Sequence, residues 1–106
     1  MNIKDVIKKA EAVRPLTEIN ERECLARVAG EVPDGGLIVE IGCLYGGTTA
    51  VLALAKPTAE VRVIDVFDWH PLDDVPTSPE LLMQNMASIG VTNVILNKIG
   101  DSLVAW

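Results

Sequence analysis

The chain has 106 residues, of which 49% are hydrophobic, which is enough for one compact domain and too little for two. It carries 9 lysines and arginines against 15 aspartates and glutamates, for a formal charge of -6. This acidic balance argues against nucleic acid as a partner, because such binding uses cationic side chains to displace counterions from phosphate. It argues equally against docking on anionic lipid.

Localisation signals and cysteine patterns exclude further classes. No apolar run approaches the roughly 20 residues of a membrane helix, and the N-terminal residues lack the apolar core of a signal peptide. We therefore expect a cytoplasmic protein. Cys24 and Cys43 have no metal-ligand spacing, so we expect two reduced thiols and no metal site.

Residues 1–34 predict two helices. In the first, which Pro15 ends, apolar residues recur at steps of three and four: Ile3, Val6, Ile7, Ala10 and Val13. The second begins near Thr17, a common N-cap residue, and runs toward Gly30 with its apolar residues at Ile19, Leu25 and Val28. Residues 33–36 (PDGG) form a turn signal.

Residues 35–106 predict alternating strands and helices within the same single domain. Residues 37–41 (LIVEI) are apolar and β-branched, which is typical of a strand covered on both faces. A glycine-rich turn at 42–47 leads into a helix at 48–55, and residues 61–66 form a second strand. The following loop, 67–77, holds two prolines and three aspartates.

Ser78, Pro79 and Glu80 predict the start of another helix, with a hydroxyl N-cap, a proline at the first position and an acid facing the helix dipole. Gly90 ends this helix, and its expected buried face consists of Leu82, Met83, Met86 and Ile89. A third strand begins at 93–96 and runs toward Asp101.

This order of elements is typical of an α/β fold with parallel strands, right-handed crossovers and helices on both faces of the sheet. Ligands of such sheets lie beyond the carboxyl ends of the strands. The unusual residues of this chain fall at those ends: Glu40 with the glycine turn, then Asp65 and Asp101.

The turn at the first strand end favours a cationic ligand. Gly42 and Gly46 let the chain turn tightly and let a ligand approach the backbone. Leu44 stands where the dinucleotide fingerprint G-x-G-x-x-G has its middle glycine, and Glu40 adds negative charge. The alternative is that these glycines only make a sharp strand-to-helix turn.

Asp65 lies about twenty residues after the turn, the offset at which an acid accepts the hydroxyls of a ribose. The alternative is a solvated aspartate at the start of a loop. Trp69 covers a heterocycle or simply packs. Asp101 and Ser102 border an adenine edge or cap a helix.

Together these segments resemble the class I S-adenosylmethionine-dependent methyltransferases. Residues 39–49 (VEIGCLYGGTT) are similar to the family's first motif, E-x-G-x-x-x-G, and residues 63–65 (VID) to its second. Residues 99–102 (IGDS) resemble the segment that borders adenine. The glycine and threonine pairs at 46–49 resemble the small-molecule O-methyltransferase branch, and the resemblance covers residues 17–106.

The resemblance implies a Rossmann-like half sheet of strand order 3-2-1, S-adenosylmethionine as cofactor and a small-molecule methyl acceptor. It places Glu40 near the methionine end of the cofactor, Asp65 at the ribose and Asp101 near the adenine. The expected cofactor-binding residues are Glu40, Gly42, Tyr45, Gly46, Asp65, Val66, Asp101 and Ser102.

The sequence matches only the N-terminal half of the family fold, whose acceptor-binding residues come mostly from the other half. His70, the one histidine, is a candidate general base, or a solvated loop residue. Without a fourth strand, residues 37–41 form a sheet edge, and we expect either a homodimer or other self-association through it, or coverage by the N-terminal helices.

Three functions follow from this sequence. The first is S-adenosylmethionine-dependent O-methylation of a small molecule, by this chain or by a longer protein that contains it. The second is a non-catalytic binding or self-assembling half-Rossmann module. The third, a nicotinamide-dependent oxidoreductase, is disfavoured by Leu44 and by the acidic turn.

Overall fold

The computed structural model describes residues 2–14, 16–67 and 75–99. In this part of the chain four helices and three strands follow one another as α1 (Ile3–Ala10), α2 (Ile19–Gly30), β1 (Leu37–Ile41), α3 (Gly47–Ala55), β2 (Glu60–Asp65), α4 (Pro79–Ser88) and β3 (Val94–Ile99).

The strands form one parallel sheet with β2 in the middle, in the order β1-β2-β3. The register places Leu37 beside Glu60 and Ile41 beside Ile64, so β1 and β2 end at the same level. Between β2 and β3 the register shifts by one residue at Val63 and Ile64. The predicted α/β class and the parallel pairing of the strands are confirmed.

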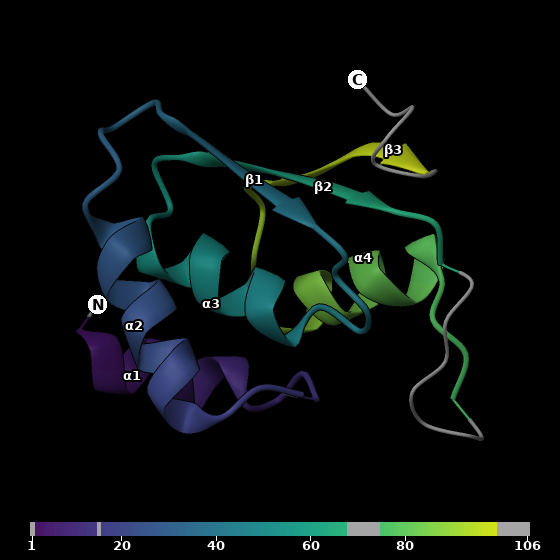
Figure 1. The fold of residues 1–106 in the computed structure, drawn as a ribbon, viewed down its shortest axis with the longest axis horizontal. Coiled ribbons are helices and arrows are strands. Elements are labelled where there is room, and N and C mark those ends of the chain that lie inside the picture. Colours follow the sequence, from purple (N-terminus) through teal and green to yellow (C-terminus); the bar gives the residue numbers. More distant parts are fainter. Residues whose placement is uncertain (1, 15, 68–74, 100–106) are drawn as a thin grey trace.

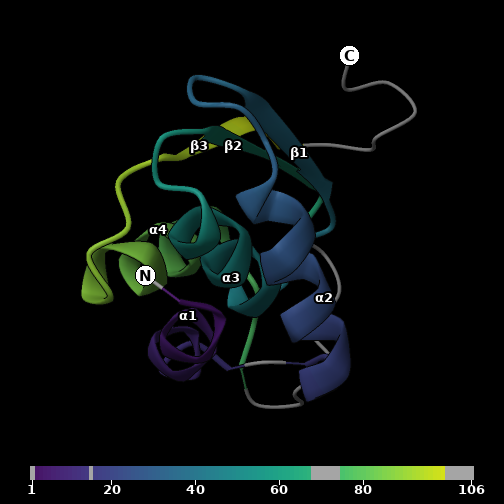
Figure 2. The same ribbon diagram turned by 90° about the vertical axis from the view of Figure 1, so that its left-hand side faces the viewer.

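All four described helices lie on one side of the sheet, as Figure 1 and Figure 2 both show. The prediction of helices on both faces is therefore wrong for the described residues, and so is the double coverage predicted for residues 37–41. Two crossovers of one hand that step in the same direction bring α3 and α4 to the same face. The helices α1 and α2 then pack on α3, with α1 on the side of α3 that faces away from the sheet (Figure 2).

α3 lies at the centre of the helix layer. It contacts α1, α2 and β2, and seven of its nine residues are buried. Small residues such as Ala50 and Ala53 let the neighbouring helices approach its backbone closely. The buried core of the domain is therefore built around this short helix.

The helices begin and end close to the predicted positions, with corrections at α2 and α4. Ser78 caps α4 as predicted, since its Oγ accepts the Leu81 N–H at 3.0 Å. Thr17 does not cap α2; Glu18 occupies that position without a side-chain hydrogen bond. The buried residues of α2 are Arg22, Ala26 and Ala29, whereas its large apolar residues Ile19 and Val28 are exposed. On α4, Met83 is exposed and not part of the buried face.

The glycine turn between β1 and α3 contains two glycines with left-handed φ angles, Gly42 at +82° and Gly46 at +98°. A Cβ atom on Gly46 would lie 2.8 Å from both Leu82 Cδ1 and Met86 Cε of α4. A Cβ on Gly42 would meet no atom within 4 Å. Gly46 is thus required for packing as well as for backbone conformation.

We expect Gly46→Ala to destabilise the domain more than Gly42→Ala. Both substitutions force alanine into a left-handed conformation, at a cost of roughly 1 kcal/mol. Only Gly46→Ala also overpacks the contact with α4, which adds about 1–3 kcal/mol. Urea unfolding of the two variants measures the difference, and equal losses would contradict the packing role of Gly46.

Candidate functional site at the carboxyl ends of β1 and β2

The carboxylate of Asp65, at the end of β2, holds the turn that follows β1. Its Oδ2 accepts the backbone N–H groups of Cys43 at 2.7 Å and Leu44 at 3.2 Å. Its Oδ1 accepts the N–H of Phe67 at 2.9 Å. Because Gly42 and Leu44 have left-handed φ angles, successive N–H groups of the turn point to one place, as in anion-binding backbone nests. The protein's own carboxylate fills that place.

These bonds keep Asp65 ionised. Partial burial raises the pKa of Asp65, but the N–H groups of Phe67, Cys43 and Leu44 together hold it below its ordinary value. A carboxylate offers about four acceptor positions, and three backbone donors already use the oxygens of Asp65.

The carboxyl of Glu40 lies deeper, on the helix side of β1. It is almost fully buried, and its Oε1 accepts a short hydrogen bond from the Thr49 hydroxyl of α3. Burial raises the pKa of Glu40 to about 7; the Thr49 bond opposes this shift and the Asp65 charge adds to it. The two acids therefore occupy different states near neutral pH, with Asp65 charged and Glu40 part protonated.

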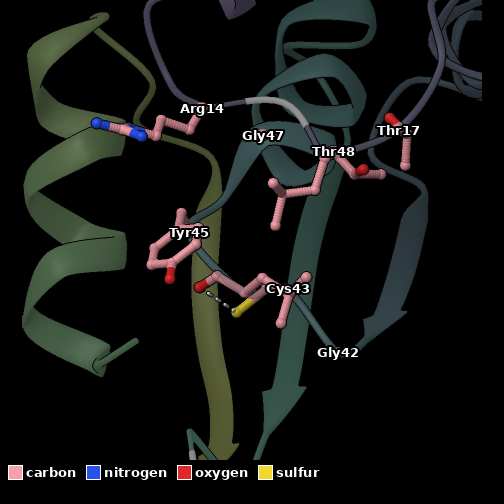
Figure 3. Close-up of a pocket in the computed structure, with 9 residues that line it drawn as sticks. Arg14, Thr17, Gly42, Cys43, Tyr45, Gly47 and Thr48 are labelled. Carbon is pink, nitrogen blue, oxygen red and sulfur yellow. Dashed lines mark hydrogen bonds between the residues drawn. The ribbon is translucent and has the colours of Figure 1, made fainter. Parts of the chain in front are cut away.

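A cavity of about 150 Å³ adjoins the turn. Its walls come from the turn itself, from the first residues of α3 and from the segment between α1 and α2: Arg14, Leu16, Thr17, Gly42, Cys43, Leu44, Tyr45, Gly47 and Thr48. Figure 3 places Arg14 and Thr17 at the end of this cavity away from Gly42. The N-terminal segment thus covers the glycine turn and closes the space beside it.

Tyr45 connects the turn to α4 and to the residues that precede it. Its hydroxyl donates to the carbonyl oxygen of Val75 at 2.5 Å, and its own carbonyl oxygen accepts from Asn85 Nδ2 at 2.8 Å. Its ring is buried and lines the cavity. Tyr45 is therefore a buried wall of the cavity, and its hydroxyl and carbonyl oxygen bond to other parts of the domain.

Cys43 lies buried beside these acids. Burial, followed by the negative charges of Asp65 and Glu40, raises the pKa of its thiol far above the ordinary value. Its Sγ lies 3.8 Å from the Leu44 carbonyl oxygen, as Figure 3 shows. Cys43 is thus a protonated, unreactive thiol, and Cys24 is a free, exposed one.

One side chain that the sequence did not single out holds the segment that lines the cavity. Arg22 of α2 is buried, and its Nη1 donates to the Thr17 carbonyl oxygen at 2.5 Å, which fixes the covering segment. Within the described residues, Arg22 Nε and Thr17 Oγ1 are buried without a hydrogen-bond partner. An arginine in an otherwise polar stretch of helix gives no sequence signal for such a position.

The structure brings together only some of the predicted site residues. Asp65 joins the turn of Gly42 and Tyr45 by hydrogen bonds, whereas Glu40 lines a separate groove between α2 and β1. Gly46 packs against α4. Thus no cavity described for residues 2–14, 16–67 and 75–99 contains Glu40, Gly46 and Asp65 together.

The other predicted residues divide into two groups. Val66, the residue after β2, is exposed beside the Asp65 carboxylate. The remaining ones lie outside the described residues: Trp69, His70, Asp101 and Ser102.

Across the part of the chain that the structure describes, there is no cluster of three or more metal-ligating side chains. No helix found there has both the length and the apolar character to cross a membrane.

Neither a protein-family model nor a curated protein matches this chain.

We expect the stability of the domain to fall between about pH 4.5 and pH 7 because of Glu40. The folded state keeps the carboxyl protonated to about pH 7, whereas an unperturbed glutamate releases its proton near 4.5, so in this window the folded state binds more protons. The loss of unfolding free energy reaches roughly 3 kcal/mol at most, at about 1.4 kcal/mol per pKa unit.

Urea unfolding at several pH values tests this expectation with Glu40→Gln, which removes the decline across that window. The matched control is Glu31→Gln, at an exposed position after α2, which keeps the wild-type slope. Asp65 acts at lower pH: with its pKa depressed, its contribution is lost only as the pH falls below its ordinary value of 3.8. An unchanged slope in Glu40→Gln would contradict the raised pKa.

Proposed function

We propose that this chain forms the cofactor-binding half of a Rossmann-like, S-adenosylmethionine-dependent methyltransferase that transfers a methyl group to an oxygen of a small molecule. The proposal combines the motif resemblance of residues 39–49, 63–65 and 99–102 with the chemistry of the turn after β1. The proposed location is the cytoplasm.

The observation that carries the proposal is the Asp65 carboxylate bound by the Cys43 and Leu44 N–H groups. In a nucleotide-binding turn such N–H groups receive a phosphate. Here a fixed negative charge already occupies them, so a phosphate would meet like charge. A positively charged ligand is favoured instead, which supports a sulfonium compound over a nicotinamide dinucleotide.

In the proposed arrangement the adenosyl group lies over the carboxyl ends of β1 and β2. The carboxylate of Asp65, which is partly exposed, receives one ribose hydroxyl. The amino-acid end of the cofactor extends toward the cavity beside Gly47 and Thr48, where the N-terminus of α3 favours its carboxylate. The negative charge of Asp65 compensates the positive charge of the sulfonium.

The proposed reaction needs positioning more than chemical assistance from the protein. When bound, S-adenosylmethionine would supply a methyl group on a positively charged sulfur: a C–O bond would form to the acceptor oxygen, and the C–S bond would break with its electron pair on sulfur. The acceptor's proton leaves to a base, for which His70 is the candidate in this chain. Alignment and exclusion of water then supply most of the rate enhancement.

The second candidate is a binding or assembly module without turnover. The observation that favours it is the uncovered face of the sheet, where Leu37, Val39 and Ile41 of β1 are exposed. An apolar face of this kind is a surface for association.

We expect calorimetric titration to show tighter binding of S-adenosylmethionine and S-adenosylhomocysteine than of NAD. Asp65→Ala should weaken the adenosyl ligands by about 10- to 100-fold, because losing a charged hydrogen-bond partner costs about 1.5–3 kcal/mol. A preference for NAD would overturn the proposal.

Because Asp65 also holds the turn, its substitution needs two controls. Asp34→Ala removes another carboxylate, which pairs with Lys56 at 3.1 Å and with the Thr58 hydroxyl at 2.7 Å, far from the strands' carboxyl ends. Hydrogen exchange of the Cys43 and Leu44 amides reports whether the turn persists. Cofactor binding without methyl transfer to a panel of hydroxylated acceptors would favour the second candidate.

A further inference from the structure

The sheet face opposite the helices carries an apolar stripe along β1. The exposed fractions are 51% for Leu37, 38% for Val39 and 57% for Ile41. Ile95 of β3 adds a further apolar residue that is 43% exposed. No helix within the described residues covers this face, as Figure 2 shows. Parallel sheets are ordinarily covered on both faces, so this stripe is a surface for a partner.

A charged pair lies on β2 between the apolar residues of β1 and β3. Arg62 Nε and Glu60 Oε2 are 2.8 Å apart, and both side chains are about two-fifths exposed. The register places Glu60 beside Leu37 and Arg62 beside both Val39 and Ile95, so alternation along the strands puts the pair on the open face. The centre of this face therefore holds one positive and one negative group in a fixed order.

We propose that this face binds the same face of a second copy of the chain. A two-fold axis between the two sheets, perpendicular to the strands, stacks one β2 on the other in the opposite direction. Arg62 and Glu60 are two residues apart on one strand and therefore share a face. When the axis passes over the position between them, Arg62 of each copy faces Glu60 of the other. The charges of the face are thus complementary to themselves, and the β1 stripes meet as apolar surfaces.

This arrangement differs from self-association through the β1 edge. A groove of about 470 Å³ runs along that edge between β1 and α2, lined by Val28, Ala29 and Val32 among others. If the β1 strands of two copies paired edge to edge about a two-fold axis, the two α2 helices would lie on the same side of the joined sheet, next to the pairing. There they would occupy the same space. Face-to-face stacking leaves α2 clear, since all described helices lie on the other side of the sheet.

We expect a weak dimer. Among the described side chains, the face offers four exposed apolar residues and one ion pair for each copy. An interface of standard size, about 800 Å² for each partner, uses 20–30 residues. Its charges enter the interface already paired, which limits the desolvation cost of burying them.

The test uses the order of the charges. Glu60→Arg gives a face with two positive groups, and Arg62→Glu gives a face with two negative groups. Sedimentation equilibrium should show concentration-dependent dimers of the wild type, and a dissociation constant at least about tenfold higher for each variant alone, because like charges then face one another. An equimolar mixture of the two variants should recover a heterodimer.

The mixture also controls for folding, because a misfolded variant would not be rescued by its counterpart. Glu31→Arg makes the same charge change after α2 and should dimerise as the wild type does. The proposal is overturned if the wild type stays monomeric to about 1 mM, if the single variants dimerise unchanged, or if the mixture stays monomeric. It is also overturned if hydrogen exchange shows that dimerisation protects the β1 amides alone, because that pattern indicates pairing through the β1 edge. Cofactor titration is a separate measurement, so failure here leaves the proposed function standing.

Discussion

The contact on which the site depends is the carboxylate of Asp65 against the N–H groups of the turn. It joins the ends of two neighbouring strands, since Cys43 and Leu44 follow β1 while Asp65 ends β2. It also lets a non-glycine residue, Leu44, adopt a φ of +50°, because the bonded N–H groups compensate for the strained backbone. One side chain thereby sets both the shape of the turn and the sign of its electrostatic field.

The environment separates the behaviour of two acids that the sequence presents as equivalent. Asp65 meets three backbone donors and stays ionised, whereas Glu40 meets one hydroxyl and a low-polarity surrounding and retains its proton to about pH 7. Neither difference is visible in the sequence, because Thr49 reaches Glu40 only after the turn has folded α3 back over β1. The protonation states of Glu40 and Asp65 therefore depend on how the folded backbone buries each carboxyl and on which donors it brings to them.

Most of the fold could be predicted from local patterns, and the failures share a cause. Periodicity and capping residues such as Ser78 located the elements, because those signals act within one or two turns of chain. The prediction that residues 37–41 are covered on both faces was wrong, because the apolar content of a strand does not tell which of its two faces another element covers. Val28 of α2 was misjudged as buried because Ala26 and Ala29 take the buried positions of this helix. Arg22, Tyr45 and Asp65 made backbone contacts across 5 to 30 residues of sequence, which no motif spacing encodes.

The burial of α3 has a consequence for how this sequence can diverge. A residue such as Ala50 or Ala53 touches several neighbours at once, so a larger side chain there would displace more than one element. The domain should therefore tolerate substitutions mainly on the exposed surface of α2 and on the exposed side of α1 that carries Lys8 and Lys9. Over many generations, the short helix after the turn would change most slowly, and its small residues would outlast the charged residues around it.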